Sequence, residues 1–286
     1  MIGGIPIYKP VLMVLGQPRL AKRGLSLVWH ALYHFFLPQF QTRLMPWVRP
    51  VVVLGHPLDS RIPFRPQEVH TYLGYMGFWL KSLRLLYDLM GREALPDIRK
   101  SFELACLLYR EAGDIYRRCQ STTTTRPAGP LSPCFLAIHL FDPHLHCIPS
   151  LHILLICYNR HMLAEVLVRQ ERLEAERLEA LREAELQAVR VTEAILLMKQ
   201  HSLLDIAPSL FLLTGLLPGF GPRQVEEYVS ELFRCWRLPE RTRRSMRSCI
   251  LDGYRELERD RKRGKKDGHR EAILRFLARY TPVAVA

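Results

Sequence analysis

Strand patterns are almost missing from this chain of 286 residues, and closely spaced cysteine pairs are absent. One β-branched run occurs, the short stretch VRPVVVLG, and the sequence shows no partner for it. Seven cysteines are present without a CxxC pair. That spacing argues against a zinc ribbon or a disulfide scaffold and indicates mostly reduced thiols. We therefore expect a helical fold without cross-links.

A cleaved secretory signal is not expected, because the N-terminal stretch MIGGIPIYKPVLMVLGQPRLAKR has no basic region before its apolar part. Two apolar stretches, 24–42 and 206–221, are candidates for membrane contact. The first carries no formal charge and just reaches bilayer length, but it contains two histidines and Pro38; the second is short and contains two prolines. Since 24% of the residues are charged, we expect a membrane-associated protein, partly embedded or surface-bound, rather than a multispan one.

Helical periodicity dominates the rest of the chain. The stretch 169–191 mixes acidic and basic residues with Ala and Leu, which predicts a helix with solvated faces but no coiled coil. The stretch QSTTTTRPAGPLSPC (120–134) is typical of a loop. Further helices are expected at 26–36, 67–91, 97–119, 150–168, 192–217, 223–236, 239–260 and 269–280. We divide the chain into an N-terminal segment that is a candidate for membrane association (1–54), a helical core (55–220) and a basic helical C-terminal region (221–286).

Two stretches carry residues suited to chemistry. In HCIPSLH, Pro149 and Ser150 predict a helix start, with Ser150 accepting hydrogen bonds from the first-turn N–H groups and His152 just inside the helix. In KQHSLLDIAPSL, His201 and Asp205 are four residues apart, which places them on one face of a helix. A carboxylate in that position can orient an imidazole and stabilise its cationic form.

A third element lies upstream, where Arg126 and Pro127 stand in the 120–134 loop and the planar guanidinium can hold an anion. The order Arg-Pro, Pro-Ser-x-His and His-x-x-x-Asp resembles the three motif blocks of the type-2 phosphatidic acid phosphatase superfamily, which includes lipid phosphate phosphatases and sphingolipid headgroup transferases. CIPSLH, KQHSLLD and the upstream stretch HPLDSRIPFRPQEVHTYLGY look like the branch of inositol phosphorylceramide synthases. The resemblance covers roughly residues 55–220 and implies an all-α helical bundle of the type-2 phosphatidic acid phosphatase and haloperoxidase fold.

The resemblance also implies an activity: a phosphatase or phosphotransferase acting on a phosphate ester, with a phosphorylated lipid as substrate and an anionic membrane surface as partner. His201 would attack phosphorus and form a phosphohistidine, Asp205 would orient the ring, and His152 would serve as general acid and base. Arg126 and the N–H groups at the Ser150 helix start would hold the phosphoryl oxygens, with no metal or other cofactor.

Two cations of the family pattern are missing here. The lysine expected seven residues before Arg126 is replaced by Cys119, which follows two arginines, and the arginine expected six residues before His201 is replaced by Ile195. Lys199 follows Ile195 by one helical turn, and spacing alone suggests that it restores a positive charge and contacts the substrate. A catalytically degenerate relative is therefore a second hypothesis, the more so because the charged residues before His201 would be costly facing lipid.

Composition supports two further hypotheses. One is a metal site, because HLFDPHLHC and the residues after it contain several His, Cys and Asp residues that can bind a metal. We disfavour this hypothesis, because no second Cys/His pair with zinc spacing is present in the sequence. Its candidate ligands are His139, Asp142, His144, His146, Cys147 and His152.

The other hypothesis from composition is a non-enzymatic helical protein. Much of the net charge of +13 lies after Gly221 and would attract anionic lipid or nucleic acid, although no nucleic-acid motif is present and nucleic acid is disfavoured.

Overall fold

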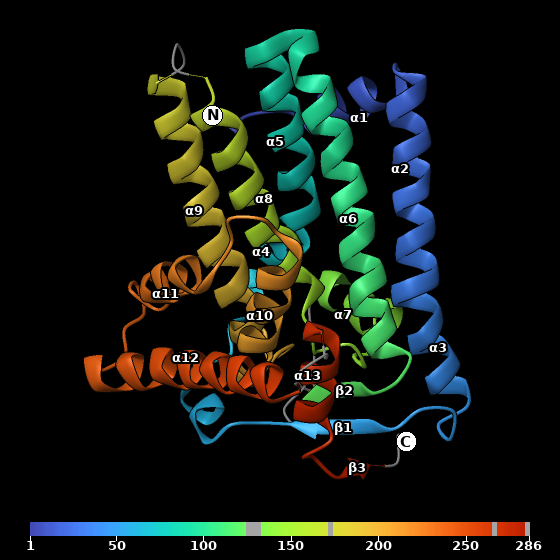
Figure 1. The fold of residues 1–286 in the computed structure, drawn as a ribbon, viewed down its shortest axis with the longest axis vertical. Coiled ribbons are helices and arrows are strands. Elements are labelled where there is room, and N and C mark those ends of the chain that lie inside the picture. Colours follow the sequence, from blue (N-terminus) through green and yellow to red (C-terminus); the bar gives the residue numbers. More distant parts are fainter. Residues whose placement is uncertain (124–132, 171–173, 265–267, 284–286) are drawn as a thin grey trace.

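The computed structural model describes residues 1–123, 133–170, 174–264 and 268–283 (Figure 1). Helices make up 74% and strands 4% of the structure, which confirms the all-α class. The helices are α1 (Tyr8–Leu15), α2 (Pro18–Ala31), α3 (Leu37–Leu44), α4 (Val69–Leu73), α5 (Tyr75–Met90), α6 (Leu95–Tyr116), α7 (Pro133–Phe141), α8 (Leu151–Val168), α9 (Glu174–Leu197), α10 (Ile206–Leu216), α11 (Pro222–Glu231), α12 (Glu240–Arg263) and α13 (His269–Leu277); the strands are β1 (Val51–Leu54), β2 (Gln120–Thr123) and β3 (Pro282–Val283).

Helix α8 lies at the centre of the bundle. The helices α2, α5, α6, α8 and α9 run roughly side by side along the long axis of the molecule, and α12 lies across their lower end (Figure 1). Helix α8 packs against α5, α6, α9 and α10, and every residue from Leu151 to Asn159 is buried. Among the described helices it is the one that is long and apolar enough to cross a membrane, yet 72% of it is buried inside the protein. Packing within the protein core accounts for this apolar character.

The predicted helix at 192–217 is wrong as a single element. Helix α9 ends at Leu197, a turn and a short 3₁₀ segment (Leu203–Asp205) follow, and α10 begins at Ile206. The chain leaves the helix at Lys199, whose φ of 57° is left-handed, and the N–H groups of the next two residues both donate to the Ile195 carbonyl. His201 therefore lies in the connection between two helices and does not share a helical face with Asp205.

The expectation that VRPVVVLG has no partner strand is also wrong. Strand β1 pairs in parallel with β2, from the stretch expected to be a loop, and antiparallel with β3 near the C-terminus. The partner sequence QSTT lacks the apolar alternation of a strand, so only tertiary contact reveals the pairing. Helices α1 and α7 were not expected either. The helix expected at 26–36 extends over α2, a π-helical turn (Leu32–Phe36) and α3.

One hydrophobic core runs through all three expected segments, from Ile2 to Leu277. Charged residues of α9 that would be costly against lipid have partners inside this structure. Glu185 pairs with Arg160 of α8. The carboxylate of Glu193 accepts hydrogen bonds from the Phe233 N–H at 2.5 Å and the Trp236 indole N–H at 2.7 Å. These contacts tie the basic C-terminal region to α9.

Candidate functional site

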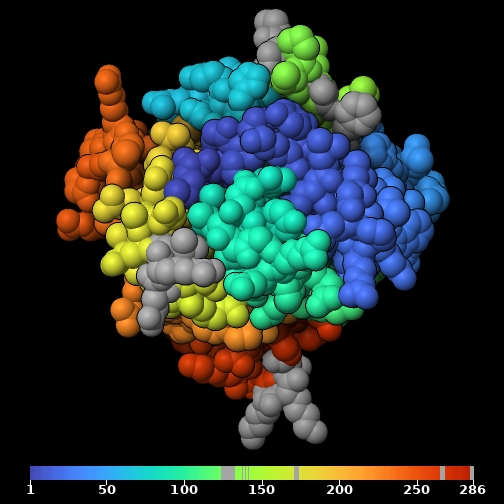
Figure 2. Space-filling view, turned by 90° about the horizontal axis from the view of Figure 1, so that it is seen from above, coloured from blue at the N-terminus to red at the C-terminus, as the bar shows by residue number. Residues whose placement is uncertain are grey.

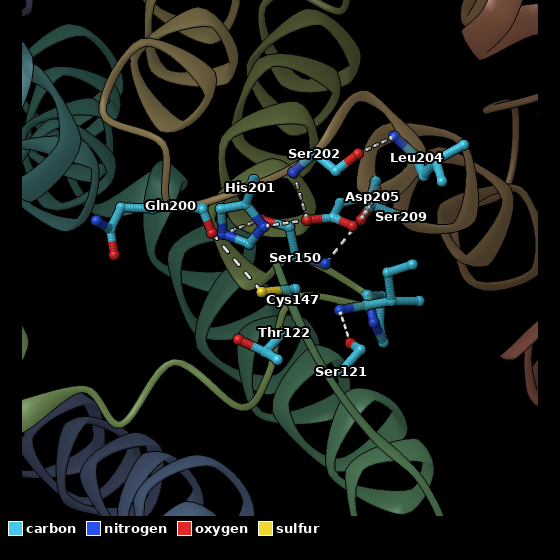
Figure 3. A network of polar contacts seen from close by, with 12 residues as sticks. Ser121, Thr122, Cys147, Ser150, Gln200, His201, Ser202, Leu204, Asp205 and Ser209 are labelled. Atoms are coloured by element: carbon cyan, nitrogen blue, oxygen red, sulfur yellow. Dashed lines mark hydrogen bonds and ion pairs between the residues drawn. The ribbon is translucent and has the colours of Figure 1, made fainter. Parts of the chain in front are cut away.

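The side chains of His201 and Asp205 form a buried hydrogen-bonded pair (Figure 3). The His201 Nδ1–H donates to Asp205 Oδ2 at 2.8 Å, and the Ser202 N–H donates to the same oxygen at 3.0 Å. The second carboxylate oxygen, Oδ1, accepts no hydrogen bond from the residues that the structure describes. This network assigns the proton of the imidazole to Nδ1, which leaves the lone pair of Nε2 directed away from the carboxylate.

The Nε2 atom of His201 faces the N-terminus of α8. Ser150, which precedes that helix, places its hydroxyl oxygen 3.4 Å from Nε2. The expectation that this hydroxyl caps the first turn of α8 is wrong, because it accepts no hydrogen bond from a first-turn N–H group. The Ser150 N–H is itself occupied, since it donates to the Ser209 hydroxyl at 2.7 Å. The N–H groups that follow it in the first turn have no intrahelical acceptors and remain suited to an anion.

His152 lies beside His201. The two ring centroids are 5.9 Å apart, close enough for both imidazoles to contact a single phosphoryl group. Tyr72 and Tyr75 hold the His152 ring, with centroids 4.2 and 4.5 Å away, and within the described part of the chain no hydrogen bond to its ring nitrogens is formed. Both imidazoles are 8% exposed. The two motif blocks thus converge, although one is carried by α8 and the other precedes α10.

Burial sets the protonation of the site. It lowers the pKa of His201 to about 4. It also lowers the pKa of His152 well below the ordinary value, with a further lowering by the nearby His201. The pKa of the Asp205 carboxyl is raised by burial and partly lowered again by the Ser202 N–H. At neutral pH both imidazoles are therefore uncharged, the form in which a histidine nitrogen can act as a nucleophile.

The expected position of Lys199 on a helical face with Ile195 is wrong. Its ammonium donates to the main-chain carbonyls of Asp59 at 2.8 Å and Ile62 at 2.5 Å, so it fastens the 59–62 turn. Arg126 lies outside the described residues. The two arginines before Cys119 are engaged in ion pairs, Arg117 with Asp114 and Arg118 with Glu271.

Asp59 is a positioning residue that sequence reasoning missed. Its Oδ1 accepts the Leu203 N–H at 3.0 Å, and its Oδ2 accepts the Ser202 hydroxyl at 2.6 Å and the His56 N–H at 2.8 Å. These bonds hold the turn that carries His201. The HPLDSRIPF stretch was the available signal, because it belongs to the same resemblance as the histidine motifs. Tyr72 and Tyr75 lie in the longer stretch HPLDSRIPFRPQEVHTYLGY (56–75) and were missed as well.

A second donor set lies at the same place. One ligand atom from each of Cys147, His201 and Asp205 lies within 4.8 Å of the others, so these buried side chains could together hold a metal ion. This set shares only Cys147 with the ligands considered from sequence. His146 is not part of it, and its ring stacks on Tyr116 with ring centroids 3.8 Å apart. A metal at this place would displace the proton between His201 and Asp205.

No protein-family model, curated protein or solved structure matches this chain. The resemblance therefore depends on the motifs and on how the fold arranges them. It requires His201 in hydrogen-bond contact with Asp205 and His152 beside them, and these three residues have that arrangement.

Replacing Asp59 by Ala should lower the free energy of unfolding by roughly 2–4 kcal/mol, because two donors of the His201 turn and the His56 N–H lose their acceptor. The matched control is Asp88→Ala on α5, which removes a surface ion pair with Arg84 and should cost less than about 1 kcal/mol. Urea unfolding followed by circular dichroism measures both. Equal stability of the two variants would contradict a positioning role for Asp59.

The His201 imidazole should stay neutral until the pH approaches 4. An unfolded chain takes up this proton near pH 6.5, so the contribution of His201 to stability is fully present above that pH and is lost as the pH falls towards 4, by up to about 3 kcal/mol. Histidine ring resonances, assigned with a His201→Asn variant and followed by NMR across this range, measure the midpoint. A titration midpoint at pH 6 or higher would show that burial does not lower the pKa of the His201 imidazole.

Proposed function

We propose that this protein is a phosphatase or phosphotransferase that acts on a phosphate ester, with a lipid phosphate as the substrate class. The observation that carries the proposal is the convergence of a neutral His201, held by Asp205, with His152 and the N-terminus of α8. The lipid class and the type-2 phosphatidic acid phosphatase fold are parts of the same proposal and derive from the motif resemblance.

The first step is an in-line attack. The Nε2 lone pair of His201 forms a bond to phosphorus while the bond between phosphorus and the ester oxygen breaks. The ring becomes cationic in the phosphohistidine, and the adjacent Asp205 carboxylate offsets that charge. The departing alkoxide takes a proton from His152. The ring is neutral in the empty site, and the negative charge of a bound phosphate ester raises its pKa, so that His152 takes up a proton from water as the substrate binds and then passes it to the leaving oxygen.

The second step restores the enzyme. His152, now neutral, removes a proton from water or from an acceptor alcohol, whose oxygen attacks phosphorus and breaks its bond to His201. The first-turn N–H groups of α8 stabilise the phosphoryl oxygens in both steps, and the motif resemblance assigns the same role to Arg126, which lies outside the described residues. Water as acceptor yields inorganic phosphate, and an alcohol yields a new phosphate ester.

A catalytically degenerate, anion-binding relative is the second candidate. Ile195 occupies the place of one expected cation and is completely buried, and Lys199 is engaged with main-chain carbonyls. The clamp on the phosphoryl group would then consist of Arg126 and the helix N-terminus. Such a site would bind phosphate without turnover.

Phosphate release from lipid monophosphates and diphosphates, in detergent with EDTA, tests the proposal. Release should survive the chelator and fall by about 10³-fold or more in His201→Ala and in His152→Ala, because each variant removes a reacting group. The control is His70→Ala, an exposed histidine of α4, which should retain full activity.

The same variants distinguish the candidates. Each is first checked for native circular dichroism, and a polyol is added in a parallel assay so that transfer to an alcohol is detected. Binding of inorganic phosphate without release or transfer by the unmodified protein would favour the degenerate relative. Activity that His201→Ala retains would refute the phosphohistidine mechanism.

A further inference from the structure

The first three helices expose an apolar face. In α1, Tyr8, Leu12 and Leu15 are 58%, 62% and 65% exposed. In α2 and the π-helical turn after it, Leu25, Trp29 and Leu32 are 72%, 62% and 51% exposed. Their spacing of three, four or seven residues gathers them along one side of each helix. A soluble monomer rarely exposes contiguous apolar area of this kind unless something covers it.

The opposite side of the same helices faces the protein core. Leu20, Leu27 and His34 are seven residues apart, and all three are buried. Helix α2 packs through this side against α6. Packing of the protein core therefore uses only the inner face of α2, and it does not explain why the outer face is apolar as well. In the space-filling view the N-terminal segment, in blue, forms a continuous area of the surface (Figure 2).

An apolar groove lies where α2 ends and α3 begins. It is lined by Trp29, Leu32, Tyr33, Phe36, Leu37 and Phe40. The rings of Trp29 and Tyr33 stack with centroids 5.9 Å apart. Aromatic side chains of this kind favour the boundary between lipid headgroups and acyl chains.

The positive charge of residues 1–58 favours an anionic lipid surface as the partner that covers this apolar face. Residues 1–58 contain six Lys and Arg residues and no Asp or Glu. Within the described residues, Lys9, Arg19 and Lys22 form no ion pair. The basic C-terminal region differs in containing acidic residues as well, and some of its arginines pair with them, as Arg243 does with Glu240. Unpaired basic residues beside an apolar face complement a surface that is apolar inside and anionic outside.

We propose that α1 and α2, with the turn after α2, dock this face on a bilayer that contains anionic lipids. Trp29 and Leu32 enter the acyl region, and Lys9, Arg19 and Lys22 contact the headgroups. The bundle lies on the surface rather than crossing it, since the neighbouring α6 carries charged side chains such as Arg110 on its exposed side, which would be costly in hydrocarbon. This inference does not depend on the proposed catalytic activity.

Flotation with vesicles of phosphatidylcholine, with and without phosphatidylglycerol, tests the docking face. The unmodified protein should float with the anionic vesicles, and the double variant Trp29→Glu, Leu32→Glu should bind at least about tenfold more weakly. The control is Leu178→Glu, Leu186→Glu on α9, where each leucine is 48% exposed but lies outside the face. This control should bind like the unmodified protein.

Two further measurements test the same proposal: vesicle binding by a charge-reversal variant, and the oligomeric state of the protein. Arg19→Glu, Lys22→Glu should weaken binding to anionic vesicles, and added salt should do the same to the unmodified protein. Circular dichroism confirms that each variant is folded. Equal binding by the unmodified protein and the Trp29, Leu32 variant would overturn the proposal. A second result would also overturn it: the unmodified protein binds no vesicles, and light scattering shows a dimer that dissociates in the Trp29, Leu32 variant. A second copy of the chain would then cover the face.

Discussion

The hydrogen bond between the buried Asp205 carboxylate and the His201 imidazole is the interaction around which the rest of the site is arranged. A carboxylate without access to water is unfavourable unless donors surround it, so the chain must bring N–H groups to it. The turn after α9 does this: it places the Ser202 N–H on one carboxylate oxygen and the imidazole on the same atom. Asp59 then holds that turn from a distant part of the chain.

The buried helix α8 connects this pair to the rest of the fold. Because it is packed on several sides, its first turn is held rigidly against the His201 turn, and Ser150 and His152 take their positions from it. The same burial removes charge from both imidazoles. The first-turn N–H groups of α8 can donate to an anionic ligand, and the negative charge of such a ligand would raise the pKa of the two histidines again.

Helical periodicity predicted most of the bundle. The motif spacing grouped His152, His201 and Asp205, and the structure places these three side chains together, while their catalytic roles stay a prediction. The break at Lys199 was missed because its left-handed conformation is stabilised by tertiary contacts, namely the carbonyls that its ammonium reaches. The β1–β2 pairing was missed for a similar reason, since QSTT becomes a strand only beside β1. The contribution of Asp59 was missed because it depends on a hydrogen bond with Ser202, 143 positions further along the chain, and local sequence patterns do not predict such a contact.

We would first measure the binding of orthovanadate by vanadium NMR, because vanadate imitates the five-coordinate phosphorus that forms when a histidine nitrogen attacks phosphorus in line. We expect one saturable site per chain in the unmodified protein, its loss in His201→Ala, and its retention in His70→Ala. Binding that is absent in the unmodified protein, or unchanged when His201 is removed, would contradict the assignment of this histidine cluster as a phosphoryl site.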